Sequence, residues 1–278
     1  MTATSTSTAA RLALALEGLR ARLRDLDRVV VAFSGGADSA FLAWVAHDTL
    51  GADRALAVTA VSPSLAPVEH DDCRALAGEW SLRWRPVATD EMANVAYRVN
   101  AGDRCFHCKD ALMDALEPVV AAEDATVVLG VNLDDLGDHR PGQDAAAERG
   151  AAFPLVEAGF TKADVRAASR VLGLRTWDKP AAACLASRLP YGTPVSAPVL
   201  KQVAEAEAAL GELGLRALRV RHYDDTARLE VPLCDLDAVL ERRGEVVDAV
   251  HSAGYRYVTL DLEGLRSGNL NAALGGGR

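Results

Sequence analysis

The sequence predicts an α/β protein with a doubly wound, mostly parallel sheet, followed by a smaller C-terminal α+β domain. Two observations predict this architecture. Short apolar runs alternate with amphipathic helical patterns as far as Gly130, which is typical of parallel strands joined by crossover helices. Beyond a Pro-rich linker, the order changes to helix, strand, strand, helix, strand. In an open parallel sheet the ligand binds beyond the carboxyl ends of the strands, so the segments after Phe33, Val61 and Leu129 are expected to line one crevice.

The elements of the first domain follow one another along the chain. Leucines spaced by four, three and four residues predict a first helix that ends at Leu26. The run Val29–Phe33 is apolar at every position, as in a strand covered by helices on both faces. The predicted strands are 29–33, 55–61, 82–87 and 126–130, and the predicted helices are 9–26, 40–48, 67–80 and 106–122.

The second half of the chain contains a capped helix, a linker and the C-terminal domain. Thr161, with Asp164 three residues later, forms a capping-box pattern that predicts a helix ending near Leu172. Prolines and glycines between 190 and 198 indicate a linker. Beyond it we expect helices 199–212 and 236–251 and strands 217–223, 227–231 and 256–260. The predicted organisation is a disordered tail 1–8, a first domain 9–192, a C-terminal domain 193–272 and a frayed tail 273–278.

Composition limits the function classes. Of the 278 residues, 30 are Lys or Arg and 39 are Asp or Glu, so the net charge is −9, which argues against binding nucleic acid through bulk charge. No apolar run approaches the roughly 18–20 residues of a membrane span, and Met1–Ala10 lacks the features of a signal peptide. Five cysteines do not suit a disulfide scaffold. We expect a cytoplasmic protein that binds neither nucleic acid nor membrane.

The segment Ser34–Ser39, with sequence S-G-G-A-D-S, separates a predicted buried strand from a predicted helix. Glycines allow a ligand to approach the backbone closely, and successive N–H groups at a helix N-terminus bind anions. The alternative is a plain Gly-Gly turn in which Asp38 or Ser39 caps the helix. The sequence contains neither G-x-x-x-x-G-K-[ST] nor a G-x-G-x-x-G after a strand, so it fits neither the ordinary nucleotide P-loop nor a dinucleotide fold.

The string S-G-G-x-D-S resembles the pyrophosphate-binding loop of the PP-loop ATP pyrophosphatases. The resemblance implies an adenine-nucleotide α-hydrolase-like fold and cleavage of ATP between its α- and β-phosphates, with Mg²⁺. Of the aspartates at 134, 135 and 138, some would hold Mg²⁺ or position ATP, or all three would belong to a polar loop. The resemblance assigns ATP binding to Ser34, Gly35, Gly36, Asp38, Ser39 and Gly130.

Four further stretches, 132–142, 177–192, 219–222 and 260–268, are together similar to the LarE family of ATP-dependent sacrificial sulfur transferases. The resemblance extends from about residue 10 to 272. It implies adenylation of a carboxylate of pyridinium-3,5-biscarboxylic acid mononucleotide, followed by thioester formation on a cysteine. Elimination then leaves a thiocarboxylate on the substrate and dehydroalanine in the protein. The product contributes to the nickel-pincer nucleotide of lactate racemase, the sulfur donor is Cys184, and self-association is expected.

Charged residues near the predicted donor support this role. Cations lower the pKa of a thiol, and Lys179 and Arg188 flank Cys184 in the sequence. Arg219 and Arg221, two apart on a predicted strand, point to the same face and form a fork for phosphate. With Arg188, they are assigned to the substrate by the resemblance. The alternatives are a small buried thiol and an ordinary solvated strand face. Glu207 and Glu230 would bind a cation or belong to ordinary helix and strand faces.

Cys105 and Cys108 form a C-x-x-C pair that allows three interpretations. Half of a zinc site is one, although a second pair at metal spacing is missing. Several PP-loop sulfur enzymes instead use such a pair with one distant cysteine to hold a [4Fe–4S] cluster. Here Cys105, Cys108 and Cys184 would be the ligands, and sulfide on the open iron would be transferred catalytically. The third interpretation is two thiols that bind nothing.

Three other functions compete with sulfur transfer to a small nucleotide. An amide ligase similar to the NAD or GMP synthetases would use ammonia and would not need Cys184. A tRNA thiolase is disfavoured by the negative charge and by the lack of an RNA-binding domain. A nucleotide sensor would bind ATP without cleaving it.

Overall fold

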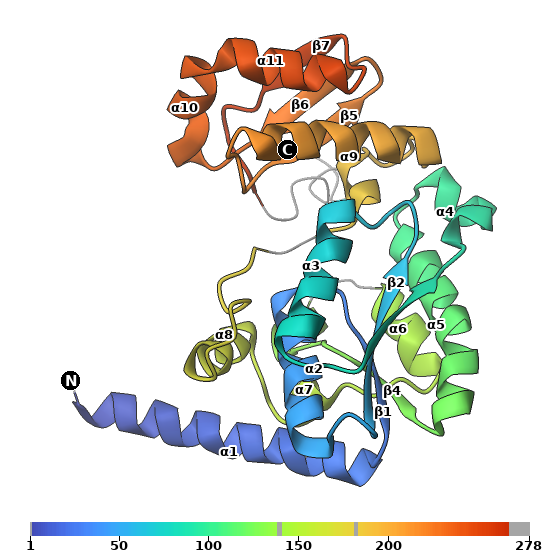
Figure 1. Ribbon diagram of the computed structural model, residues 1–278, viewed down its shortest axis with the longest axis vertical. Helices are drawn as coiled ribbons and strands as arrows, with labels where there is room; N and C mark the ends of the chain where they lie inside the picture. The colour runs from blue at the N-terminus through green and yellow to red at the C-terminus, as the bar shows by residue number, and fades with distance from the viewer. Residues whose placement is uncertain (1, 138–140, 181–182, 267–278) are drawn as a thin grey trace. The chain divides into compact units, whose positions relative to one another are not determined.

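The computed structural model describes residues 2–137, 141–180 and 183–266, and Figure 1 shows its elements. The chain forms two compact units. The first comprises residues 1–62, 69–91 and 105–182, and the second comprises 63–68, 92–104 and 183–278. The second unit therefore includes two segments from the N-terminal half of the chain. The predicted C-terminal domain 193–272 does not include these two segments, because nothing in their composition distinguishes them from the residues around them. The predicted tail 273–278 lies outside the described residues.

The sheet of the first unit is parallel, as predicted. Its strands are β1 (Val29–Ala32), β2 (Ala55–Val61), β3 (Trp84–Ala88) and β4 (Thr126–Leu129), in the order β3-β2-β1-β4. β1 lies at the centre, with Val29 paired to Ala55 on one side and to Thr126 on the other. Because all four strands run in the same direction, the segments that follow them emerge at one edge of the sheet.

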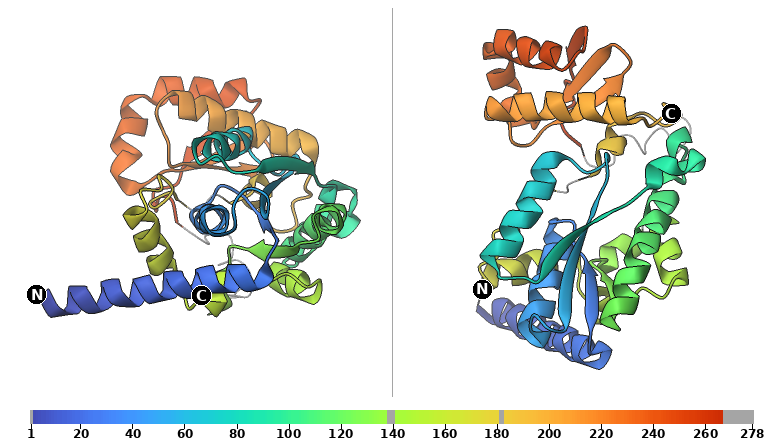
Figure 2. Two further views of the ribbon diagram at one scale, coloured as in Figure 1. Left: turned by 60° about the horizontal axis from the view of Figure 1, so that its bottom comes forward. Right: turned by 45° about the vertical axis from the view of Figure 1, so that its right-hand side comes forward.

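Helices cover both faces of this sheet (Figure 2, right). Val29 and Val31 pack on one face, and the intervening Val30 packs on the other, as strand geometry requires. The first face is covered by α1 (Thr2–Leu26), α2 (Ala37–Leu50), α3 (Pro67–Glu79), α7 (Pro154–Glu157) and α8 (Lys162–Val171). The second is covered by α5 (Arg104–Glu123) and α6 (Pro141–Glu148). These two apolar layers confirm the doubly wound architecture.

Several helix limits differ from the prediction. The helix α1 begins at Thr2 rather than at residue 9, because residues 2–8 are Thr, Ser and Ala and include neither Gly nor Pro, which break helices. The helices α6, α7 and α4 (Val95–Val99) are not predicted from the sequence, because they are too short to show a periodic apolar pattern. The capping box of Thr161 and Asp164 is present as predicted. None of the helices in the described part of the chain combines the length and apolar character that a membrane span requires.

The second unit contains the predicted α+β arrangement. Its strands β5 (Arg219–Tyr223), β6 (Thr226–Glu230) and β7 (Tyr257–Leu260) form a sheet in that order, with β5 antiparallel and β7 parallel to β6. The helices α9 (Ala197–Glu212), α10 (Leu236–Glu241) and α11 (Arg243–Ser252) pack on the apolar face. The predicted helix 236–251 is interrupted at Arg242, whose φ of −100° and ψ of 23° depart from helical values.

Short 3₁₀ turns complete the structure. They are η1 (Glu91–Ala93), η2 (Leu133–Gly137), η3 (Leu185–Arg188) and η4 (Leu233–Asp235). Two of them matter for the site, because η2 follows β4 in the first unit and η3 follows Cys184 in the second.

Candidate active site

The loop Ser34–Ser39 connects β1 to α2, and its two serines hold it closed. The backbone N–H of Ser34 donates to Ser39 Oγ over 3.2 Å, and the two hydroxyls lie 3.0 Å apart. Ser39 Oγ also lies 3.2 Å from the carbonyl oxygen of Gly36, to which it donates. Gly36 is the N-cap residue and provides no side-chain cap, so the loop delivers uncapped N–H groups at the start of a 14-residue helix. This arrangement suits an anion.

Two glycines allow the loop to pack closely. Gly35 has φ of +71°, a value that favours glycine, and a Cβ there would lie 2.9 Å from Cys73 Sγ. Gly130, directly after β4, lies so close to the loop that a Cβ would be 2.7 Å from Ser39 N. The end of β4 therefore supports the loop through backbone contact, as expected for segments at the same edge of a parallel sheet.

Asp38 links the loop to two neighbouring segments. Asn132 donates from Nδ2 to Asp38 Oδ1 over 3.3 Å, and the Lys162 ammonium pairs with the other carboxylate oxygen. The aspartates of η2 accept backbone hydrogen bonds: Asp134 accepts from Lys162 N over 2.7 Å, and Asp135 accepts from Asn132 N over 3.1 Å. These contacts show the two carboxylates acting within the polar loop. The third candidate, Asp138, lies outside the described residues.

Lys179 belongs to the first unit and lies near the phosphate loop. Its ammonium is 2.7 Å from both Glu69 Oε2 and Asp72 Oδ2. Burial lowers the pKa of Lys179, but the hydrogen bonds to these carboxylates outweigh it, so the pKa lies above its ordinary value. The neighbouring Cys73 is buried, and burial raises the pKa of its thiol to about 11. Cys73 is therefore a neutral packing residue.

Cys184 is exposed at the N-cap of η3 in the second unit. The residues around it are fixed through their backbones. Leu185 N donates to Ser64 O over 2.9 Å. Arg188 Nη1 donates to the carbonyl oxygens of Ala183 at 2.6 Å and Cys184 at 3.3 Å. The thiol thus lies on a short, anchored turn rather than in a core.

Two more guanidinium groups bind carbonyl oxygens of the same turn. Arg104 Nη1 donates to Ala186 O over 2.8 Å, and Arg221 Nη1 donates to Ser187 O over 2.7 Å. Asn100, in the left-handed conformation at φ 59°, donates to the carbonyl oxygens of residues 190 and 193 and accepts from Arg104. We call Arg104, Arg188 and Arg221 the arginine clamp. It holds the backbone that carries Cys184.

The carboxylates of the second unit neutralise this cluster. Arg188 forms a two-point pair with Glu207 at 2.8 and 3.0 Å. Arg221, only 2% exposed, pairs with the fully buried Glu230 at 2.7 Å. Glu207 and Glu230, for which cation binding was one prediction, thus each pair with guanidinium groups.

Arg219 is the partly exposed member of the predicted phosphate fork. Burial, together with the charges of Arg188 and Arg221, lowers its pKa from the ordinary value. The three arginines predicted to bind substrate thus lie within one electrostatic cluster, and their contact with a substrate stays a prediction. Arg221, however, is buried by contacts within the unit.

The C-x-x-C pair opens α5 in the first unit, with Cys105 exposed and Cys108 partly buried. Lys109 follows this pair. Burial lowers the pKa of Lys109 below its ordinary value, and the smaller opposing effect of the two thiols does not restore it. Within residues 2–137, 141–180 and 183–266, no group of three or more Cys, His, Asp or Glu side chains is placed to hold a metal ion. Cys105 and Cys108 lie in the first unit and Cys184 in the second, so the iron–sulfur cluster stays a prediction and we derive no step through it.

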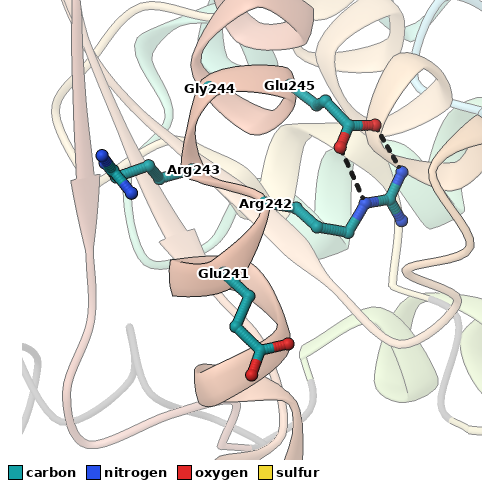
Figure 3. A pocket seen from close by; sticks show the side chains of 5 residues that line it. All are labelled: Glu241, Arg242, Arg243, Gly244 and Glu245. Atoms are coloured by element: carbon teal, nitrogen blue, oxygen red, sulfur yellow. Dashed lines mark hydrogen bonds and ion pairs between the residues drawn. The ribbon is translucent and has the colours of Figure 1, made fainter.

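A shallow depression at the junction of α10 and α11 is lined by residues 241–245 (Figure 3). Arg242 pairs there with Glu245, with Nη2 2.7 Å from Oε2. Its lining contains no nucleophile, so the chemistry-bearing side chains lie elsewhere.

Comparison with known proteins identifies the family. A model of the NAD synthase family matches residues 15–111, the part that contains the phosphate loop. An uncharacterised protein of Synechocystis is 45% identical over 262 residues, which cover 93% of this chain and 97% of that protein. The pyridinium-3,5-bisthiocarboxylic acid mononucleotide synthase of Lactiplantibacillus plantarum is 39% identical over 266 residues, 95% of this chain and 96% of that enzyme. The chain belongs to the LarE family. A more distant relative, an uncharacterised protein of Methanocaldococcus jannaschii, is 25% identical over 241 residues, 86% of this chain and 91% of that protein.

Membership of the LarE family makes this protein an ATP-dependent sulfur transferase of the PP-loop superfamily. The sequence revealed its contiguous motifs but missed three residues of the site. Ser64, Asn100 and Arg104 hold the Cys184 turn from segments far away in the sequence. Only the Asn-Ala-Gly stretch at 100–102 gave a local signal, that of a turn.

Proposed function

We propose that this LarE-family enzyme adenylates a carboxylate of pyridinium-3,5-biscarboxylic acid mononucleotide and transfers to it the sulfur of Cys184. The name of the Lactiplantibacillus plantarum relative supports the substrate class. The observation that carries the proposal is the exposed thiol on a turn whose carbonyl oxygens are bound by three guanidinium groups. A residue kept only for packing would be buried, as Cys73 is.

The first step is adenylation. A carboxylate oxygen of the substrate attacks the α-phosphorus of ATP, and pyrophosphate leaves with the electron pair of the broken P–O bond. Ser34, Gly35, Gly36, Asp38, Ser39 and Gly130 form the ATP site in this proposal. The N–H groups at the start of α2 and the serine hydroxyls stabilise the leaving pyrophosphate. Mg²⁺, when bound with ATP, neutralises phosphate charge.

The second step transfers sulfur. The Cys184 thiolate attacks the acyl carbon, AMP leaves, and a thioester forms. A base removes the α-proton of residue 184, the Cβ–S bond breaks, and its electron pair remains on sulfur. The products are a thiocarboxylate on the substrate and dehydroalanine in the protein. The arginine clamp holds the backbone of the turn, so the sulfur of Cys184 is presented from a fixed position.

The arginines divide their roles in this proposal. Arg219, which is partly exposed, contacts the phosphate of the substrate nucleotide, and Arg188 lies beside it in the same cluster. Arg221 contributes charge and holds Ser187 O, because its side chain is buried against Glu230. The predicted fork therefore has one phosphate-binding arm and one positioning arm.

Intact-protein mass after a single turnover tests the proposal. The wild-type chain is expected to lose the mass of one H₂S, and Cys184→Ala is expected to lose nothing. Cys234→Ala is the matched control, because Cys234 is also exposed in the second unit and is expected to leave the mass loss intact. Many turnovers with an unchanged mass would contradict sacrifice of the cysteine.

Two variants of the chemistry are outcomes of the same experiments. Iron and sulfide retained after anaerobic purification would favour transfer through a cluster held by Cys105, Cys108 and Cys184. Activity of Cys184→Ala with ammonia would favour an amide ligase instead.

The cellular setting is also part of the proposal. We place the enzyme in the cytoplasm as a homo-oligomer, acting on a small nucleotide for lactate racemase maturation, without nucleic acid or membrane partners. The net charge of −9 supports the absence of a nucleic-acid partner. Light scattering of the purified chain measures its oligomeric state.

A further inference from the structure

Lys179 is placed against the phosphate loop, although its sequence position suggested another role. A Cβ built on Gly35 would lie 3.8 Å from Lys179 Nζ. Gly35 is the loop residue with positive φ, and the three atoms nearest to this Cβ belong to Cys73, Leu76 and Lys179. The first two are buried residues of α3, so Lys179 supplies the charged group among the three.

Contacts on its backbone and side chain hold Lys179 in this position. Its backbone N donates to Thr176 O over 3.2 Å, and its carbonyl accepts from Arg166 Nη2 over 3.1 Å. The ammonium is paired with Glu69 and Asp72, and only 17% of the side chain is exposed. A protonated, partly buried cation therefore lies at the loop before any nucleotide binds.

The carboxylate next to it has another partner. Arg175 donates from Nη2 to Asp72 Oδ1 over 2.6 Å and from Nε to Glu79 Oε2 over 2.8 Å. If the ammonium turned away, Asp72 would retain this guanidinium, and the carboxylate of Glu69, whose side chain is 26% exposed, would be solvated by water. Turning a flexible lysine by a small angle is therefore inexpensive at this site.

We propose that Lys179 is a phosphate-contacting residue of the ATP site, whose ammonium leaves Asp72 to bind the triphosphate over the loop Ser34–Ser39. This inference rests on the proposed function and deepens it. The loop itself offers neutral N–H and hydroxyl donors, whereas a triphosphate carries several negative charges. Hydrogen bonds from a charged donor to an anion are about twice as strong as neutral ones. Lys179 supplies such a donor.

This role differs from thiol activation in the step that it affects. A cation that activates Cys184 would accelerate thioester formation and leave pyrophosphate formation unchanged. A cation on the triphosphate affects ATP binding and pyrophosphate formation even where no thiol is present. The two roles therefore separate in a protein that lacks the thiol.

The experiment compares variants in a Cys184→Ala background, measuring Mg-ATP affinity without the second substrate and then single-turnover pyrophosphate formation with it. Lys179→Met is expected to weaken Mg-ATP binding, to slow pyrophosphate formation, or both, by roughly 10- to 100-fold in total. Lys179→Arg, which retains the charge, is expected to recover most of the loss. Arg74→Met is the matched control, since it removes an exposed cation of α3 that pairs with Asp71 and contacts neither Gly35 nor Asp72.

Three results would overturn the inference. They are unchanged Mg-ATP binding and pyrophosphate formation in Lys179→Met, an equal loss in Arg74→Met, or failure of Lys179→Arg to recover either quantity. If Lys179→Met does not fold, Lys179→Gln, which removes the charge but keeps hydrogen-bond donors for Glu69 and Asp72, takes its place with the same expected loss. Absence of pyrophosphate with Lys179 intact would contradict the proposed function instead, and the binding of Mg-ATP alone would still test Lys179.

Discussion

The phosphate loop and the Cys184 turn are positioned by opposite means. The loop in the first unit is held by close packing against glycines. Cys73 approaches Gly35, and the backbone of Ser39 approaches Gly130, to distances that a Cβ would not allow. The turn in the second unit is held by long side chains, because three guanidinium groups reach its carbonyl oxygens. One region is fixed by sterics and the other by charge.

The difference matches the roles that we propose for the two regions. A triphosphate needs bare N–H groups and room for close approach, which glycines provide. A sulfur donor needs a rigid backbone, which arginines bound to carbonyl oxygens provide. Substitutions in the two regions should therefore fail for different physical reasons.

The largest effect is expected from the buried pair of the second unit. Arg221→Met removes the buried guanidinium partner of the fully buried Glu230 and leaves the partly exposed Arg228 at 3.1 Å, so it should destabilise the protein by about 3 kcal/mol in chemical denaturation. Arg221→Met combined with Glu230→Gln should cost less than the sum of the single changes. The exposed pair at Arg242 is the control, and Arg242→Met should leave the unfolding midpoint unchanged. If the double variant loses as much unfolding free energy as the two single variants together, the charge pair does not hold the clamp.

Gly130→Ala tests the steric side of the comparison. Its Cβ would lie 2.7 Å from Ser39 N and 2.9 Å from Asp38 C, both backbone atoms that cannot rotate away. We expect a loss of about 1–3 kcal/mol in unfolding free energy and weaker binding of Mg-ATP by calorimetry. Gly78→Ala in α3 meets no atom within 4 Å and should be neutral or slightly stabilising. Full Mg-ATP affinity in Gly130→Ala would remove the steric argument.

Arg104→Met should separate the two half-reactions. It removes the donor to Ala186 O and loosens the turn that carries Cys184, so sulfur loss should slow by about tenfold while pyrophosphate formation persists. Rapid-quench mass spectrometry measures both rates. Arg98→Met, on an exposed side chain of the same segment, should change neither rate. Equal slowing of both steps in Arg104→Met would mean a general loss of structure.

The smallest effect concerns a charge away from both regions. The hydrogen bond and charge of Arg11, with help from Thr161, outweigh burial and lower the pKa of Asp164 from 3.8 to about 2. A lowered folded-state pKa stabilises the protein above the unfolded pKa, and this contribution is lost as the pH falls from about 4 to about 2. The stability difference between wild type and Asp164→Asn should shrink over that window. A difference that is constant with pH would assign the effect to packing.

The sequence predicted most of what is local in this molecule. The Ser34–Ser39 string, the capping box at Thr161 and the strand pattern are contiguous, so each could be interpreted without knowing the fold. Gly130 directly follows a predicted strand, and its assignment to the ATP site came from the family resemblance. Cys184 is exposed, and its role as sulfur donor stays a prediction.

What could not be predicted depends on distant partners. Lys179 is five positions from Cys184 in the sequence, yet its ammonium contacts Glu69 and Asp72 of α3 and lies near Gly35 of the loop, which adjacency in the sequence does not reveal. The burial of Arg221 depends on Glu230 from another strand. Arg104 contacts a carbonyl 82 positions away, a separation that no periodicity reveals.

The interleaved course of the chain has a consequence for biosynthesis. Residues 63–68 and 92–104 leave the ribosome well before residues 183–266, so the second unit completes its hydrogen bonds only late in translation. A gene fragment that starts at residue 183 would encode Cys184 without Ser64, Asn100 or Arg104. Co-expression of the missing N-terminal piece as a separate chain would test whether the Cys184 turn can form from two chains.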